Sequence, residues 1–105
     1  MTMVQIVVAN PTYAAQLEKL LLSDGQLQVL RPPVPDLNLD GVVVLDVDCF
    51  NRLESRLRRP ERVVLVASRE EESLSRAWEA GLRSVVYEDD PMQTTLLAVM
   101  AAELR

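Results

Sequence analysis

Carboxylates carry most of the possible chemistry in this chain, because the sequence contains no histidine and a single cysteine. Asp46 stands out among them, since it directly follows Val42–Leu45, the most hydrophobic run of the chain. A carboxylate at the end of a buried strand can act as a nucleophile or bind a cation. It can also be purely structural, accepting backbone N–H bonds or capping a neighbouring helix.

Further acids lie where the predicted strands end. Asp48 comes shortly after Asp46, and Glu88 and Asp89 follow the predicted strand Ser84–Tyr87. Together these side chains could form an acidic mouth that holds a cation. Acids at the rim of a crevice are more often simply solvated, so no metal site is predicted.

Other kinds of site lack the residues they need. The absence of histidine excludes the usual His/Cys zinc sites and catalysis by a histidine base. Cys49, with no histidine to activate it, is better explained as a small buried residue at the start of a helix. The loop 9–12 contains no glycine, which argues against a dinucleotide cradle. An enzyme is therefore the weaker interpretation, and no cofactor is expected.

The composition indicates a single globular domain over residues 1–105. With 11 basic and 16 acidic residues the net charge is −5, which argues against a nucleic-acid surface. No segment has the pattern of a secretion signal or a membrane span, so a cytoplasmic location is expected. A basic cluster forms either a solvated helix face or a small patch for an anionic partner; it consists of Arg52, Arg56, Arg58, Arg59 and Arg62.

Strand and helix signals alternate along the whole chain. The predicted strands are short apolar runs, namely Val4–Val8, Gln26–Leu30, Val42–Leu45, Val63–Val66 and Ser84–Tyr87. Helices are predicted between these strands from their caps. The first is predicted to start at Asn10 with Pro11 and to end at Gly25, and the following helices are predicted to start at Asp48, at Ser68 with Glu71, and at Asp90 with Pro91. This order predicts a three-layer α/β fold in which helices cover both faces of a five-stranded parallel sheet.

One crossover departs from this pattern. Three prolines in four residues forbid a helix in the segment that joins the second and third predicted strands, 31–40. An extended segment of this length can still span the distance. We therefore expect the second helix to be missing or irregular, with Leu37 or Leu39 covering sheet that a helix would normally cover.

These elements give the chain a resemblance to the receiver domain of bacterial response regulators (the CheY-like, flavodoxin-type fold). Gly41–Asp46 resembles a receiver's third strand, which ends in the phosphoacceptor aspartate. Ala80–Tyr87 is similar to the alanine-glycine step into the fifth strand, and Asp90–Pro91 lies near the proline that starts the last helix. The resemblance implies the strand order 2-1-3-4-5, with Asp46 in a crevice at the carboxyl ends of the strands.

The resemblance also implies a set of residues around the aspartate, and most of them are changed. Acids that would hold Mg²⁺ are replaced by Ala9 and Asn10, and the hydroxyl position falls on Ala67. The adjacent Ser68 is expected to point the other way. A glutamate, Glu88, occupies the position of the lysine that would pair with the phosphoryl group, and Tyr87 falls one residue late for the switch aromatic.

The changed pocket, which includes Asp48, suggests a degenerate pseudo-receiver that acts as a protein-interaction module in two-component-type signalling. A phosphoacceptor receiver that uses Asp46 and Mg²⁺ stays open as an alternative, and a small α/β enzyme as a distant one. Its partner, a protein or a second copy of the chain, is expected on the last helix, whose apolar arc looks wider than one sheet face requires. The residues of that arc are Leu96, Leu97, Val99, Met100 and Leu104. No nucleic acid or membrane partner is expected.

Overall fold

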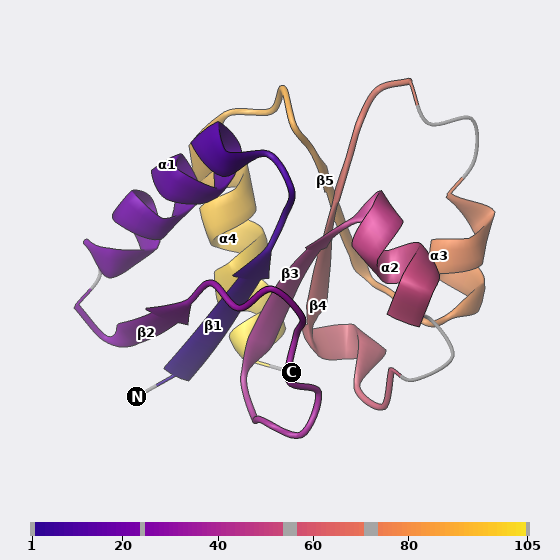
Figure 1. Cartoon of the computed structure of the whole chain (residues 1–105), viewed down its shortest axis with the longest axis horizontal. Helices are drawn as coiled ribbons and strands as arrows, with labels where there is room; N and C mark the ends of the chain where they lie inside the picture. Colours follow the sequence, from indigo (N-terminus) through magenta and orange to yellow (C-terminus); the bar gives the residue numbers. More distant parts are fainter. Residues whose placement is uncertain (1, 24, 54–56, 71–73, 105) are drawn as a thin grey trace.

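The computed structural model describes residues 2–23, 25–53, 57–70 and 74–104. In chain order the elements are β1 (Thr2–Val7), α1 (Pro11–Leu22), β2 (Leu27–Leu30), β3 (Val42–Asp46), α2 (Val47–Leu53), the 3₁₀ turn η2 (Pro60–Arg62), β4 (Val63–Ala67), α3 (Ser75–Glu79), β5 (Ser84–Tyr87) and α4 (Met92–Glu103). Every strand pair is parallel, and the order β2-β1-β3-β4-β5 confirms the predicted receiver-type sheet (Figure 1). Across the described ranges, no helix is long and apolar enough to span a membrane.

Two helical layers enclose the sheet, with α1 and α4 on one face and α2 and α3 on the other (Figure 1). Because side chains alternate along a strand, each central strand contributes to both cores. On β3, for example, Val44 faces α1 and α4 while Leu45 faces α2 and α3, and both are fully buried. The apolar runs that predicted the strands are therefore continuous because both faces of the sheet are covered.

The first helix begins and ends as its sequence predicts. The side-chain oxygen of Asn10 accepts the backbone N–H groups of Thr12 and Tyr13, each at 3.1 Å, and Pro11 is the first helical residue. These bonds satisfy donors that a helix N-terminus leaves without partners. After the last turn the chain passes through Gly25, whose φ of 77° is disfavoured for other residues.

The second helix is capped by a different aspartate from the one predicted. Asp46, not Asp48, accepts the backbone N–H of Cys49 at the start of α2. The apolar spacing before Pro60 predicts that this helix includes Leu57, but Leu57 lies outside α2 and packs on the core from there. The basic cluster is consequently not one helix face, and its Arg56 lies outside the described residues.

Two more caps are corrected in the second half of the chain. Ser68 accepts the N–H of Glu70 in a turn, α3 starts later at Ser75, and Glu71 lies outside the described residues. Trp78 lies at core spacing with Leu74 and Ala77, which predicts an inward-facing side chain, but on α3 it is 54% exposed and that prediction is wrong. Asp90 accepts the N–H of Tyr87, and α4 starts after Pro91 without a side-chain cap.

The crossover from β2 to β3 contains no helix, as the prolines predict. It runs as an irregular segment past β1 (Figure 1). Pro35 is buried and Leu37 half-buried, whereas Leu39 is largely exposed. The segment therefore covers the sheet with a proline and one leucine rather than with a helical apolar face.

A buried glutamine on the interior strand β1 holds this segment in place. Gln5 is 2% exposed; its amide nitrogen donates to the carbonyl of Asp36 at 2.9 Å, and its amide oxygen accepts the N–H of Asp36 at 2.8 Å. An irregular segment cannot satisfy its own backbone groups as a helix does, so a side chain from the sheet supplies both partners.

We predict that Gln5→Ala destabilises the fold by about 2–3 kcal/mol, because it removes both bonds and leaves a small cavity beneath the crossover. The free energy of unfolding in urea measures this effect. Gln28→Ala is the matched control, since Gln28 is exposed on the neighbouring strand β2 and should change stability by less than about 0.5 kcal/mol. Equal effects of the two substitutions would contradict the anchoring role of Gln5.

Candidate functional site

A crevice of about 270 Å³ opens at the carboxyl ends of β1, β3 and β4. Parallel strands end at one edge of the sheet, so residues far apart in sequence meet there. The lining residues include five of the six predicted pocket positions: Ala9, Asn10, Asp46, Asp48 and Glu88. Val47, Val66 and Ser68 complete the lining. The residues predicted from the sequence therefore lie together at this crevice, except that a neighbouring residue replaces the predicted one at the end of β4.

That exchange concerns the hydroxyl position. Ala67, the predicted position, is 1% exposed and does not line the crevice, whereas Ser68 does. The expectation that Ser68 points away is therefore wrong. The chain leaves the strand after Ala67, so the strict alternation of side chains no longer holds at the next residue. The hydroxyl oxygen of Ser68 accepts the backbone N–H of Glu70 at 3.0 Å.

Asp46 is held by backbone groups from two different loops. One carboxylate oxygen accepts the N–H of Ala9, after β1, and the other accepts the N–H of Cys49, in α2, both at 2.8 Å. Bonds from N–H groups to a carboxylate are among the stronger hydrogen bonds in proteins. The side chain thus ties the β1–α1 loop to the first turn of α2. This is the structural role that the sequence left open for Asp46.

The crevice does not provide a magnesium site of the receiver kind. The oxygen of Asn10 already accepts two N–H groups of α1, and both oxygens of Asp46 are similarly engaged. Nowhere in the described part of the chain do three or more potential metal ligands of the His, Cys, Asp and Glu types come together. Mg²⁺ requires oxygen ligands in a strict octahedral arrangement, so these residues do not fit the ion.

The other three acids of the predicted acidic mouth do not form one cluster. Glu88 and Asp48 are exposed at the rim of the crevice. Asp89 instead forms an ion pair with Arg69 at 3.0 Å. The position at which a receiver would place a lysine therefore carries a negative charge, which would repel a phosphoryl group near Asp46.

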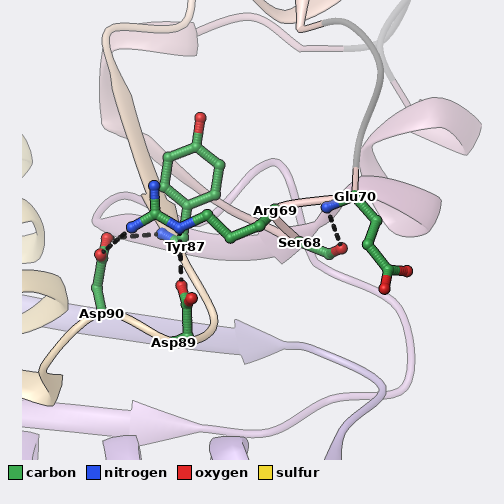
Figure 2. Close-up of polar contacts among 6 residues, drawn as sticks. All are labelled: Ser68, Arg69, Glu70, Tyr87, Asp89 and Asp90. Atoms are coloured by element: carbon green, nitrogen blue, oxygen red, sulfur yellow. Dashed lines mark hydrogen bonds and ion pairs between the residues drawn. The ribbon is translucent and has the colours of Figure 1, made fainter.

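Arg69 links the loops after β4 and β5 on the other side of the crevice, and Figure 2 shows its surroundings. Its guanidinium donates to Asp89 at 3.0 Å and to Asp90 at 2.9 Å, and it lies 4.1 Å from the centre of the Tyr87 ring. Asp90 also accepts the backbone N–H of Tyr87. The hydrogen bond that Arg69 donates to Asp89 is the main reason that the pKa of Arg69 is raised. Sequence reasoning missed this cluster, because Arg69 and its partners follow different strands.

Cys49 is buried, at 8% exposure, in the first part of α2. Burial, and then the negative charge of Asp46, raise the pKa of its thiol. A raised pKa disfavours the nucleophilic thiolate. These properties agree with a packing role for this cysteine.

Comparisons with known proteins support the fold. No protein-family profile matches the sequence, and no curated protein matches it. Among solved structures, the chain is similar to a provisionally assigned response regulator from Chloroflexus aurantiacus J-10-fl, with a TM-score of 0.77 and 18% identity over 99% of this chain and 98% of that one. It is also similar to the response regulator ChrA of a heme-sensing two-component system, with a TM-score of 0.66 and 20% identity. That match covers 97% of this chain and 56% of the other.

These similarities establish a receiver-type fold over nearly the whole chain. At such low identities, structural similarity does not show which residues of this chain are phosphorylated or bind metal. The crevice has to be judged from the geometry of its own side chains.

We predict that Asp46→Asn lowers the free energy of unfolding by about 1–2 kcal/mol, because an amide nitrogen would face one of the two N–H donors. Urea unfolding measures the change, and Asp48→Asn, exposed on the same crevice, is the matched control. A loss of stability confined to Asp46→Asn supports the structural role. No difference between the two variants would refute it.

Proposed function

We propose that this chain is a receiver-like protein-interaction module of two-component-type signalling that acts in the cytoplasm without metal-dependent phosphorylation of Asp46. The observation that carries the proposal is the engagement of both Asp46 oxygens by backbone N–H groups. A phosphoryl transfer to either oxygen would break one of these bonds. In this proposal the chain is a binding protein rather than an enzyme, and it uses no cofactor.

The loops around the crevice support a fixed rather than a switching arrangement. Asp46 ties the β1–α1 loop to α2, and Arg69 ties the loop after β4 to the loop after β5. Tyr87, the residue nearest to a receiver's switch aromatic, lies under the guanidinium of Arg69. A switch needs two arrangements of similar free energy, and these contacts favour one of them.

A phosphoacceptor receiver is the second candidate, because Asp46 and Ser68 share the 270 Å³ crevice. In that case Mg²⁺ would be required, and the phosphoryl group would lie close to Glu88. The two candidates differ in whether a phosphoryl mimic binds at Asp46.

We predict that beryllofluoride with Mg²⁺ produces no saturable shifts in the amide NMR spectrum. The reason is that the crevice lacks the ligands for the ion and carries Glu88 at its rim. Asp46→Asn is the control for non-specific effects of the salt. Saturable shifts at Asp46, Ser68 and Glu88 that disappear in this variant would establish the phosphoacceptor instead.

The surface offered for partner binding lies on α4. Leu97, Met100 and Leu104 are 66%, 41% and 87% exposed and follow one another at helical spacings of three and four. Of the other residues predicted for this surface, Val99 is fully buried in the core and Leu96 is half-buried against it. We call Leu97, Met100 and Leu104 the α4 stripe.

A second copy of this chain is the occupant we propose for the α4 stripe. The sequence from Met92 to Ala102 contains no charged residue, so two copies of α4 can meet around a twofold axis at Leu97 and Met100 without like-charge contacts there, despite the net charge of −5. Exposed apolar side chains grouped on one helix face are typical of interaction surfaces.

We predict that the protein self-associates in sedimentation equilibrium and that Leu97→Glu shifts it to monomer by placing a charge in the contact. The free energy of unfolding of the monomer should stay within about 0.5 kcal/mol, because Leu97 is exposed. Gln16→Glu, which adds the same charge at an exposed position on α1, is the control. Equal association of both variants would exclude the α4 stripe as the dimer contact.

A further inference from the structure

A cavity of about 360 Å³ lies beside Asp46, in the layer where a second helix would otherwise pack. Its walls come from the end of β1, the proline segment after β2, and α2. It adjoins the crevice described above, with which it shares Ala9 and Asp46, but it extends toward the proline segment and α2 rather than toward β4 and Glu88. Cavities of 300–1,000 Å³ are the size at which proteins bind small organic molecules.

The cavity has a mixed lining, in which a buried apolar wall faces a stiff proline segment. Val7, Cys49 and Leu53 line it and are each less than 10% exposed. Pro32 and Pro33 form part of the opposite wall, and proline fixes the backbone φ there. Further along this segment, the bonds between Gln5 and Asp36 hold the chain to the sheet. The site is therefore preformed, which lowers the entropy cost of binding a ligand.

Two arginines flank the cavity from opposite walls, Arg31 on the proline segment and Arg52 on α2, and both are exposed. Arg31 pairs with Glu18 at 3.3 Å. Arg52 reaches only the backbone carbonyl of Asp48, at 3.4 Å, and none of the described carboxylates forms an ion pair with it. Because Glu18 already balances the charge of Arg31, Arg52 is the guanidinium at this cavity that favours an anionic ligand, and Arg31 can share its donors with the same ligand.

Asp46 fixes the orientation of such a ligand. Its carboxylate is half-buried within the lining, whereas the arginine side chains lie at the surface. An anionic head group would be repelled near Asp46 and attracted at the arginines, while the interior offers apolar contacts. The head group should therefore stay at the mouth and the apolar body should point inward.

We propose that this cavity binds a small organic carboxylate with an apolar body, whose head group pairs with Arg52 and Arg31. The guanidinium is suited to this role because its donors match the two oxygens of a carboxylate. The cavity shares no residue with the α4 stripe, so ligand binding in the cavity can be tested independently of the proposed partner binding.

Octanoate is the probe for the test, with 1-octanol as the uncharged molecule of the same chain length. In amide NMR titrations we expect saturable shifts at Val7, Cys49 and Leu53 and an affinity for octanoate at least about tenfold higher than for octanol. Arg52→Gln should weaken octanoate binding by about tenfold and leave octanol binding unchanged. Arg83→Gln, an exposed arginine on the approach to β5, should change neither.

Cys49 provides a second readout, because it is the chain's single cysteine and lines the cavity. Saturating octanoate should slow its alkylation by N-ethylmaleimide severalfold, and Arg52→Gln should lessen this protection at equal octanoate. Three results would overturn the proposal: no saturable shift at millimolar octanoate, equal loss of affinity in Arg52→Gln and Arg83→Gln, or shifts confined to the α4 stripe, which would indicate non-specific apolar association.

Discussion

A parallel sheet must be covered on both faces, and this chain does so although one of its crossovers has no helix. A helix satisfies its own backbone hydrogen bonds, but an irregular segment packed on a sheet needs partners from elsewhere. Gln5 supplies them to Asp36 from the interior strand β1. The side chain of Gln5 occupies a core position that an apolar residue would otherwise fill, and its hydrogen bonds fix the path of the proline segment. The cavity beside α2 follows from the same arrangement, because a segment of prolines fills less of the layer than a helix would.

The same principle applies at the carboxyl end of the sheet, where side chains form hydrogen bonds with backbone groups and with each other. Asp46 joins the loop after β1 to α2, and Arg69 joins the loop after β4 to the loop after β5. Such contacts make the crevice rigid at the expense of the chemistry its residues could otherwise perform. An aspartate whose two oxygens each accept an N–H bond at 2.8 Å is a structural connector between the segments it joins.

The strands could be predicted because a buried parallel strand is recorded locally, as a run of β-branched residues such as 42–45. The strand order and the crevice followed from the resemblance those elements carry. Choices between neighbouring residues could not be made this way. Asp46 rather than Asp48 caps α2 because it also reaches the N–H of Ala9, which is distant in sequence. Likewise, the apolar residues of α4 surround the helix almost evenly, so only the packed structure separates buried Val99 from exposed Leu97.

The cavity and the α4 stripe lie on opposite faces of the sheet, yet a continuous set of contacts joins them. Asp46, which lines the cavity, holds the N–H of Ala9, and the next residue, Asn10, caps α1. On α1, the buried hydroxyl of Tyr13 shares a 2.7 Å hydrogen bond with Thr95 of α4. Burial raises the pKa of the Tyr13 hydroxyl above its ordinary value. A continuous set of contacts does not by itself couple two sites. Coupling would require the hydrogen bond between Asp46 and the N–H of Ala9 to have two alternative arrangements. Because Asp46 bonds both loops at once, that contact is where occupancy of the cavity could alter the position of α1, and through Thr95 that of α4.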